Sequence, residues 1–265
     1  MRSAPPRGRS ESRDVRPLRR ADRDRDSLLH GGRLAALLKE RLPRFLYENG
    51  LSLFFLGLFL LTVFGESIAG LWAYNHEQAL QDQPTVSYAR YLVSSDFGAN
   101  LLENWQSEWL QFWVFALATV WLVQKGASES KQLGEEGPQD DKQQRVGRFA
   151  PARAPRWAKA RGWRQRLYAN SFGILMAAIF FATWMGQSVT SWTVFNDEQR
   201  ANDAATVSWA RYVVSSDFWQ RTLQNWQSEF LAVGAMVVFT IYLRQRGSPE
   251  SKPVGAPHEE TASSG

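Results

Sequence analysis

The chain has 265 residues, a formal net charge of +5 and no cysteine, which excludes disulfides and thiolate metal sites. Its charges are concentrated in the N-terminal 44 residues, a central linker and a short tail, while four other stretches carry almost none. A helix of a soluble protein needs a polar face, so these four stretches argue against a soluble globular domain.

The N-terminal segment, residues 1–44, is basic. Residues 1–33 are rich in Arg, Asp, Ser and Pro, a composition typical of disorder. The first long apolar run begins only near Phe45, so no signal peptide is expected. Four leucines share one helical face next to Arg and Lys, which predicts a helix in the lipid headgroup layer, with a frayed cytosolic helix as the alternative: Leu34, Leu37, Leu38 and Leu42.

An internal repeat covers most of the remaining chain. A shift of 121 residues aligns 47–131 with 168–252 without a gap, and 35 of the 85 aligned positions are identical. Identity is 21 of 35 across 74–108 but only 6 of 27 across 47–73. The apolar stretches have exchanged side chains freely, as lipid-facing surfaces allow. The segment between them is more restricted, either by function or by a more demanding fold.

Each copy contains two apolar stretches that are candidate membrane spans. The first, 51–73 and 172–194, would each extend roughly 34 Å as a helix, enough for a bilayer core of about 30 Å. The second, 109–123 and 230–243, are shorter and need the residues before them to approach full length. The predicted fold is therefore all-α and integral to the membrane. It has four transmembrane helices in two tandem, parallel-repeat helical hairpins with outward interfacial helices.

These patterns divide the chain into five segments. They are the basic N-terminal segment 1–44, the membrane repeats 45–131 and 166–252, a linker at 132–165 and a disordered tail at 253–265.

The orientation follows from the distribution of Lys and Arg, because cationic loops resist translocation. The numbers of Lys and Arg are 13 in residues 1–44, 1 in 74–104, 11 in 124–166, 3 in 195–225 and 3 in 244–265. Both termini and the linker are therefore predicted to be cytoplasmic, in the cytoplasmic membrane of a bacterium. The basic and aromatic run at 148–166 is predicted to attract anionic lipid, in preference to nucleic acid, whose phosphates and bases Arg and Trp can also bind.

The segment between the two predicted spans of each copy, which faces outward in this orientation, contains a closely similar sequence. It is TVSYARYLVSSDF at 85–97 and TVSWARYVVSSDF at 206–218. Helical spacing places Tyr88, Tyr91 and Leu92 on one side of a predicted interfacial helix. Ser94 or Ser95 is then expected to cap a second helix, which runs through the NWQSE motif into the membrane.

Polar residues near the outer boundary form the candidate site. Glu66 and Glu108 are predicted at one depth, where repulsion would leave them a shared proton. The second copy has Gln187 and Glu229 there, so a hydrogen bond is the common requirement and charge is optional. These residues either anchor helix ends or form an ion or proton site. Each copy adds an arginine that is a candidate for pairing with an aspartate or with the interfacial Glu residues, although a solvated surface charge is the commoner case. The arginine–aspartate pairs would be Arg90 with Asp96 and Arg211 with Asp217.

No residue constellation predicts an enzyme. The three histidines (His30, His76, His258) lie far apart and cannot form a helical metal pair. The sequence has no Gly-rich phosphate loop before a Lys-Ser/Thr pair and no nucleophile elbow. No catalytic residue, metal or cofactor is expected.

The motifs resemble those of a known family. They are E-N-G at 48–50, G-E-S or G-Q-S, N-x-E-Q, NWQSE at 104–108 and 225–229, and K-G-x-x-E-S-K at 125–131. Each copy is similar to a family of small bacterial membrane proteins described only as a domain of unknown function. The resemblance implies a paired-helix membrane module and no known activity, ligand or catalytic residue. The second copy departs from it at Ala169, Ser171 and Pro249.

Two hypotheses for the function remain. The first is a non-enzymatic membrane protein whose outward loop modules pack together or contact a protein partner or lipid. The second is a small proton- or cation-conducting bundle that uses Glu66, Glu108 and Glu229. Four helices are few for a transporter, so the second hypothesis favours a homo-oligomer, although the sequence does not show one.

Overall fold

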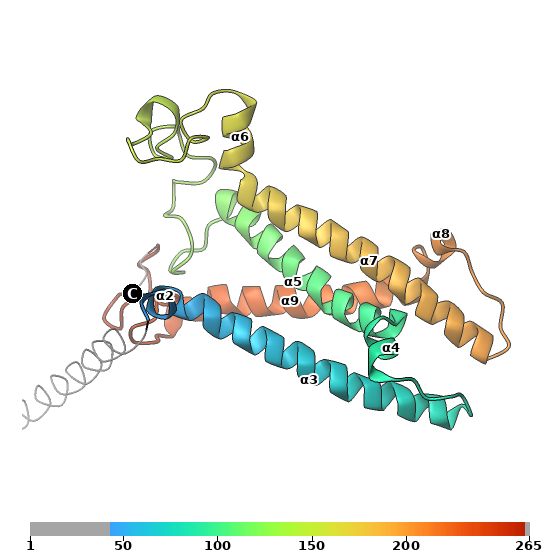
Figure 1. The fold of residues 1–265 in the computed structure, drawn as a ribbon. Helices are drawn as coiled ribbons and strands as arrows, with labels where there is room; N and C mark the ends of the chain where they lie inside the picture. Colours follow the sequence, from blue (N-terminus) through green and yellow to red (C-terminus); the bar gives the residue numbers. More distant parts are fainter. Residues whose placement is uncertain (1–42, 263–265) are drawn as a thin grey trace, which may run out of the picture. The chain divides into compact units, whose positions relative to one another are not determined.

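The computed structural model describes residues 43–262, and all regular structure in that range is helical, which confirms the predicted all-α class. The predicted headgroup-layer helix, the N-terminal residues 1–42 and the last three residues of the tail lie outside the described residues. The helices in chain order (Figure 1) are α2 (Arg44–Glu48), α3 (Gly50–Leu80), α4 (Tyr88–Leu92), α5 (Ser95–Trp121), the 3-10 turn η1 (Gly147–Phe149), α6 (Trp163–Ala169), α7 (Ser171–Ala201), α8 (Trp209–Tyr212) and α9 (Ser216–Tyr242).

The chain divides into two compact units, one ending at Ala69 and one beginning at Gly70. The described part of the first unit consists of α2 and the first part of α3. Its large apolar side chains are exposed, for example Leu51 at 76% and Leu61 at 65%. An exposed apolar surface of this extent is unfavourable in water but suits a helix that faces lipid.

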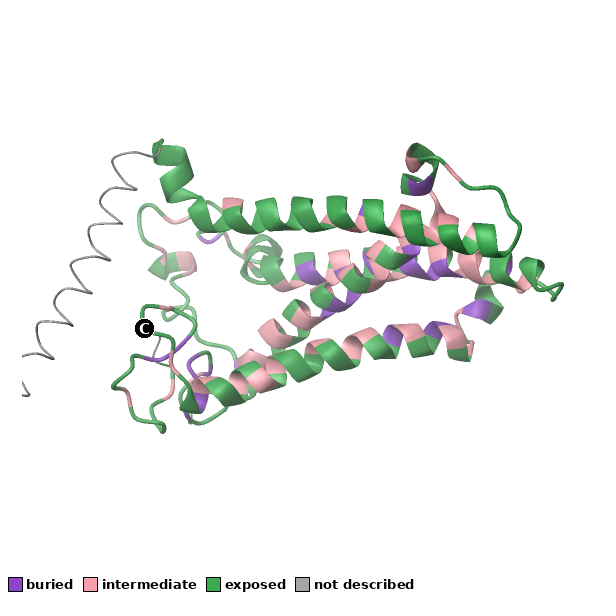
Figure 2. Ribbon diagram, turned by 90° about the horizontal axis from the view of Figure 1, so that it is seen from below, coloured by how far each residue is buried: buried purple, intermediate pink, exposed green. Residues whose placement is uncertain are grey.

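Two helices in the described range, α3 and α7, are long and apolar enough to cross a membrane. Each has 31 residues, or roughly 46 Å of helix. They are longer than the predicted spans 51–73 and 172–194 because each continues through the N-x-E-Q motif. Only 6% of the most apolar part of α3 and 28% of that of α7 are buried, and Figure 2 shows exposed residues along the helices together with partly buried ones. This exposure differs from that of a core helix in a soluble protein.

In the second unit, α5 packs lengthwise along α7. The two helices are antiparallel, because Gly98 of α5 faces Thr190 of α7 while Leu117, further along α5, faces Gly173 near the start of α7. Between these points, a Cβ on Gly186 would lie 2.9 Å from Leu102. Glycine at this position therefore allows the close approach. The second helix of copy one thus packs against the first helix of copy two.

The third helix of this unit, α9, contacts α5 and shares an aromatic cluster with α7. The Trp184 ring of α7 lies 5.9 Å from Trp226 and 6.1 Å from Phe218, measured between ring centroids. Phe180 lies 6.2 Å from Trp226. Aromatic pairs at such distances add stability beyond their buried area, so the three helices form one bundle.

The predicted serine caps are confirmed at the starts of α5 and α9. The Ser94 hydroxyl accepts a hydrogen bond from the Phe97 N–H at 3.2 Å, and Ser215 accepts from the Phe218 N–H at 3.3 Å. Both helices continue through NWQSE as predicted. They end slightly before the predicted limits 123 and 243, because Leu122 and Leu243 have extended backbone.

The predicted outward interfacial helices are only a single turn each, α4 and α8. Their shared tyrosines are buried, whereas Leu92, predicted on the same side of the helix as Tyr91, is partly exposed. Tyr91 is 2% exposed and Tyr212 is 0% exposed, whereas Leu92 is 38% exposed. The tyrosines turn inward because they pack against other aromatic rings. Tyr91 lies between Tyr74 and Phe97 in tilted contacts, and Tyr212 lies between Phe195 and Phe218 in tilted and edge-on contacts.

Candidate functional site

The predicted acidic pair of the first copy falls in different units. Glu66 is a half-exposed residue of α3 in the first unit, whereas Glu108 is an exposed residue of α5 in the second. Their approach therefore stays a prediction.

The predicted hydrogen bond between Gln187 and Glu229 is not formed. Gln187 is 0% exposed, and neither atom of its amide has a hydrogen-bond partner among residues 43–262. Glu229 is half-buried on α9 and lies near Glu108, close enough for the two charges to repel each other. The physical reason is the packing of the helices. The face of α7 that carries Gln187 is covered within the bundle, whereas Glu229 lies on α9 with its charge near that of the exposed Glu108.

The predicted arginine–aspartate pairs are also not formed. Arg90 and Arg211 are exposed and make no ion pair within the described range. Asp217 instead pairs with Arg221, whose Nε lies 3.2 Å from the aspartate Oδ2. These two residues are four apart on α9, a spacing that favours pairing on a helix. That spacing is the sequence signal from which this pair was predictable.

Asp217 and Arg221 belong to a polar network that joins α9 to α5. The Tyr212 hydroxyl donates to Asp217 Oδ2 at 3.0 Å. The Asn225 amide donates to Glu103 Oε1 at 3.3 Å, and Arg221 Nη1 lies 3.9 Å from Glu103 Oε2. The side chain of Glu103 is only 15% accessible, and that of Arg221 is 38% accessible. A half-buried acid is thus compensated by a cation from the other copy.

The two NWQSE motifs meet directly next to this network. The Trp226 indole N–H donates to Gln106 Oε1 at 2.8 Å, and Gln106 is 0% exposed. The Gln106 amide in turn donates to the Glu103 carbonyl at 3.1 Å. Hydrogen bonds between apolar helices hold them together where hydrophobic burial is weak. The motif therefore has a structural role in joining the two copies.

The outward loops of the two copies are built in the same way. The Asn75 side chain donates to the Val86 carbonyl at 3.0 Å and accepts from the Val86 N–H at 2.7 Å. Asn196 makes the same two bonds to Val207, at 3.0 and 2.8 Å. These asparagines explain the N of the N-x-E-Q motif. Each side chain makes two hydrogen bonds to the backbone of one residue at the far end of the loop, and these bonds hold the two ends of the loop together.

A polar cavity of about 590 Å³ lies between the two loop modules. Burial raises the pKa of Asp96, and the nearby charges of Asp197 and Glu77 raise it further. Burial also raises the pKa of Glu198. Arg200 is the positively charged residue among those that line the cavity, and it forms an ion pair with Asp197. Four carboxylates from both copies therefore give one negative pocket: Glu77, Asp96, Asp197 and Glu198.

No group of three or more His, Asp or Glu residues in the range 43–262 is placed to hold a metal ion. What the arrangement offers is a cavity with excess negative charge, which attracts a cationic group.

The closing K-G-x-x-E-S-K motifs end α5 and α9. The Ser130 hydroxyl accepts from the Gln124 N–H at 2.8 Å, and Ser251 accepts from the Gln245 N–H at 2.9 Å. Lys131 donates to the Val120 carbonyl at 3.1 Å, which places a cation at the C-terminal end of a helix, where it is stabilising. The Ser128 hydroxyl then donates to the Glu250 carbonyl at 3.2 Å, so the two closing loops touch.

We predict that Arg221→Met lowers the free energy of unfolding by about 1–2 kcal/mol, because it leaves Glu103 and Asp217 without their cation. Thermal unfolding in detergent, followed by Trp fluorescence, measures the effect. Arg200→Met is the matched control. Its ion pair is exposed, with side chains 63% and 62% accessible, so the change is expected to stay below about 0.5 kcal/mol. Equal effects of the two substitutions would show that the network does not stabilise the bundle.

The comparisons with known proteins give one match. The sequence model of a family described as "Domain of unknown function (DUF6766)" matches residues 42–263, which include both copies of the repeat. No curated protein and no solved structure matches the chain.

Proposed function

The chain belongs to the DUF6766 family of unknown function, and from that premise we propose that it is a non-enzymatic multi-pass membrane protein whose outward end binds a cationic group of a partner. The observation that carries the proposal is the acidic cavity that both loop modules line together.

Four crossings are supported by the packing of the second unit. If α7 spans the bilayer, α5 lies at the same depth, because the two are in contact from Gly98 and Thr190 at one end to Leu117 and Gly173 at the other. The contacts of α5 with α9 join nearly equivalent positions of the two copies, Glu103 with Asn225 and Gln106 with Trp226. The helices α5 and α9 are therefore parallel and at one depth.

The proposed orientation places the loops at 81–87 and 202–208 outside and the linker in the bacterial cytoplasm, as the distribution of Lys and Arg indicates. The basic run at 148–166 would then face anionic lipid of the inner leaflet.

Because the chain has no cysteine, single introduced cysteines report the topology directly. We expect Gln83→Cys and Ala205→Cys to react with a membrane-impermeant maleimide in intact spheroplasts. Arg153→Cys in the linker is expected to react only after the cells are lysed. Labelling of Arg153→Cys in intact cells, or protection of both loop cysteines, would contradict the orientation.

The binding of a cationic group by the outward pocket is testable with a basic peptide. We expect a fluorescent tetralysine peptide to bind the purified chain in a neutral detergent, more weakly as salt rises, because salt screens the carboxylates. Neutralising two of them with Glu77→Gln and Glu198→Gln is expected to weaken binding about tenfold, which corresponds to about 1.4 kcal/mol.

The matched control removes two acids elsewhere, with Glu135→Gln and Glu259→Gln, both of which are exposed. Its net charge changes by the same amount, so nonspecific attraction would fall equally in both double variants. Equal affinities of the two double variants would therefore exclude the pocket as the binding site.

A proton- or cation-conducting bundle is the second candidate, and the repulsion between Glu108 of α5 and Glu229 of α9 favours it. Two carboxylates that repel each other can share a proton or hold a cation. We expect such a bundle to dissipate a pH gradient across liposomes, and the Glu108→Gln/Glu229→Gln double variant to abolish that flux. A flux no greater than that of empty vesicles would exclude this candidate.

A further inference from the structure

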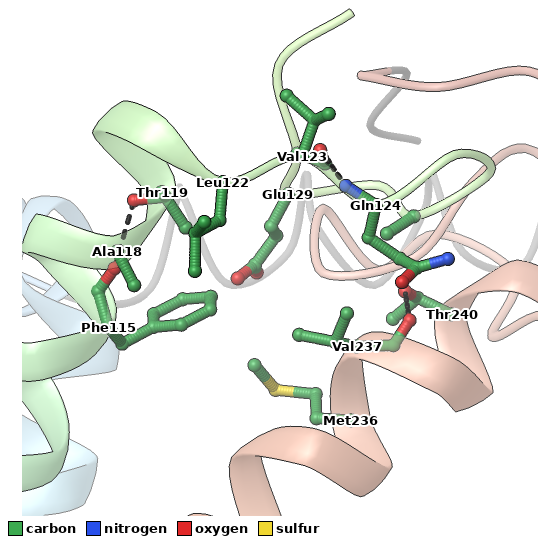
Figure 3. A pocket seen from close by; sticks show the side chains of 12 residues that line it. Phe115, Ala118, Thr119, Leu122, Val123, Gln124, Glu129, Met236, Val237 and Thr240 are labelled. Atoms are coloured by element: carbon green, nitrogen blue, oxygen red, sulfur yellow. Dashed lines mark hydrogen bonds between the residues drawn. The ribbon is translucent and has the colours of Figure 1, made fainter. Parts of the chain in front are cut away.

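A second cavity lies at the other end of the bundle, where α5 and α9 end. Its volume is about 410 Å³, within the range of about 300–1,000 Å³ that is common for small-molecule sites. Its walls are mainly apolar, with Phe115 and Leu122 from the α5 side and Met236 and Val237 from α9. Figure 3 shows that the Glu129 carboxyl group points into this cavity toward the ring of Phe115.

Glu129 comes from the closing loop of copy one and meets its counterpart from copy two. Its carboxyl group shares a hydrogen bond with Glu250, and this bond, together with partial burial and the repulsion of the Glu250 charge, raises the pKa of Glu129 to about 7. The pair therefore holds one proton over much of the range below neutral pH.

The lysines that end the two closing motifs, Lys131 and Lys252, do not neutralise this pair. Lys131 donates to the carbonyls of Val120 and Gly137, at 3.1 and 2.6 Å. Lys252 is 1% exposed and donates to three carbonyls of the tail, at 2.9 to 3.1 Å. No ion pair within residues 43–262 includes Glu129. An apolar cavity thus contains an acid without a protein cation.

We propose that this cavity binds a hydrophobic monocation, with the apolar body of the ligand between α5 and α9 and its positive charge between the Glu129 carboxylate and the Phe115 ring.

Charge complementarity selects this class of ligand. A neutral apolar ligand would leave the carboxylate facing an apolar surface, and a hydrophobic anion would be repelled by it. A cation gains the attraction of the carboxylate and, over the face of Phe115, a cation–π contribution of about 0.5–2 kcal/mol. The cavity has one carboxyl group directed into it and otherwise mostly apolar walls, which favours a single diffuse charge over a compact, strongly hydrated ion.

Binding is expected to be linked to a proton. The ligand stabilises the ionised form of Glu129, so the proton that the Glu129–Glu250 pair holds is released when the ligand binds. Affinity therefore rises with pH through about 7, where the free pair loses this proton.

The test uses the purified full-length chain in a neutral maltoside detergent and tetraphenylphosphonium as the probe, measured by isothermal titration calorimetry against protein-free micelles. We expect saturable binding with one site per chain, which tightens between pH 6 and pH 8. Tetraphenylborate, which has nearly the same shape and the opposite charge, is expected to bind at least tenfold more weakly.

Three variants identify the site. Glu129→Gln is expected to weaken binding at least tenfold at pH 8, and Ala118→Phe, which fills the cavity from α5, is expected to do the same. Glu250→Gln should retain binding but lose its pH dependence between pH 6 and pH 8, because Glu129 then stays ionised throughout. Glu135→Gln, an exposed acid away from the cavity, should match the wild-type chain.

The proposal is overturned if the wild-type chain binds no probe, if tetraphenylborate binds as tightly as tetraphenylphosphonium, or if Glu129→Gln binds as tightly as the wild-type chain. Gel-filtration profiles and melting temperatures show which variants are folded. Should Ala118→Phe fail to fold, Glu129→Gln and the comparison of the two probe ions still decide the outcome. Loss of tetralysine binding at the opposite end of the bundle would leave this result unaffected.

Discussion

The lengthwise packing of α5 along α7 is the contact on which the rest of the second unit depends. It joins the second helix of one copy to the first helix of the other, with glycines at two points of close approach: Gly98 and Gly186. Between apolar helices in lipid there is little hydrophobic driving force, so close packing and hydrogen bonds have to supply the stability. This packing brings α9 against α5, which in turn creates both the Glu103–Arg221 network and the cavity beside Glu129.

The packing also gives a reason for the identity between the two copies. Many identical positions build the loops: Asn75 and Asn196 close the outward loops, Ser94 and Ser215 cap helices, and Ser130 and Ser251 end them. The shared motifs are therefore explained by folding, and their identity alone no longer indicates a partner. The candidate binding sites lie where acidic residues of the two copies come together, in the outward pocket and at the Glu129–Glu250 pair.

Local features of the fold were predictable from the sequence, while contacts between distant segments were not. The capping serines and the long helices through NWQSE follow from residue types at short spacing, which depend on nothing outside the segment. The contacts Glu103–Arg221 and Gln106–Trp226 depend on which helices pack together. The Glu103–Arg221 pair also cannot be recognised by comparing the copies, because neither residue is repeated. Copy two has Gln224 in place of Glu103, and copy one has Asn100 in place of Arg221. The inward turn of Tyr91 and Tyr212 likewise depends on rings from other segments.

The same packing explains why one copy has an acid where the other has an amide. Gln187 lies on α7, which α5 covers, and it is 0% exposed. A buried carboxylate there would cost several kcal/mol more than a buried amide unless a cation compensated it. Even the amide, without a hydrogen-bond partner in the described range, costs about 1–3 kcal/mol. Glu66, the equivalent residue of α3, is half-exposed. The difference between the copies therefore follows from burial, since a hydrogen bond between Gln187 and Glu229 is not formed.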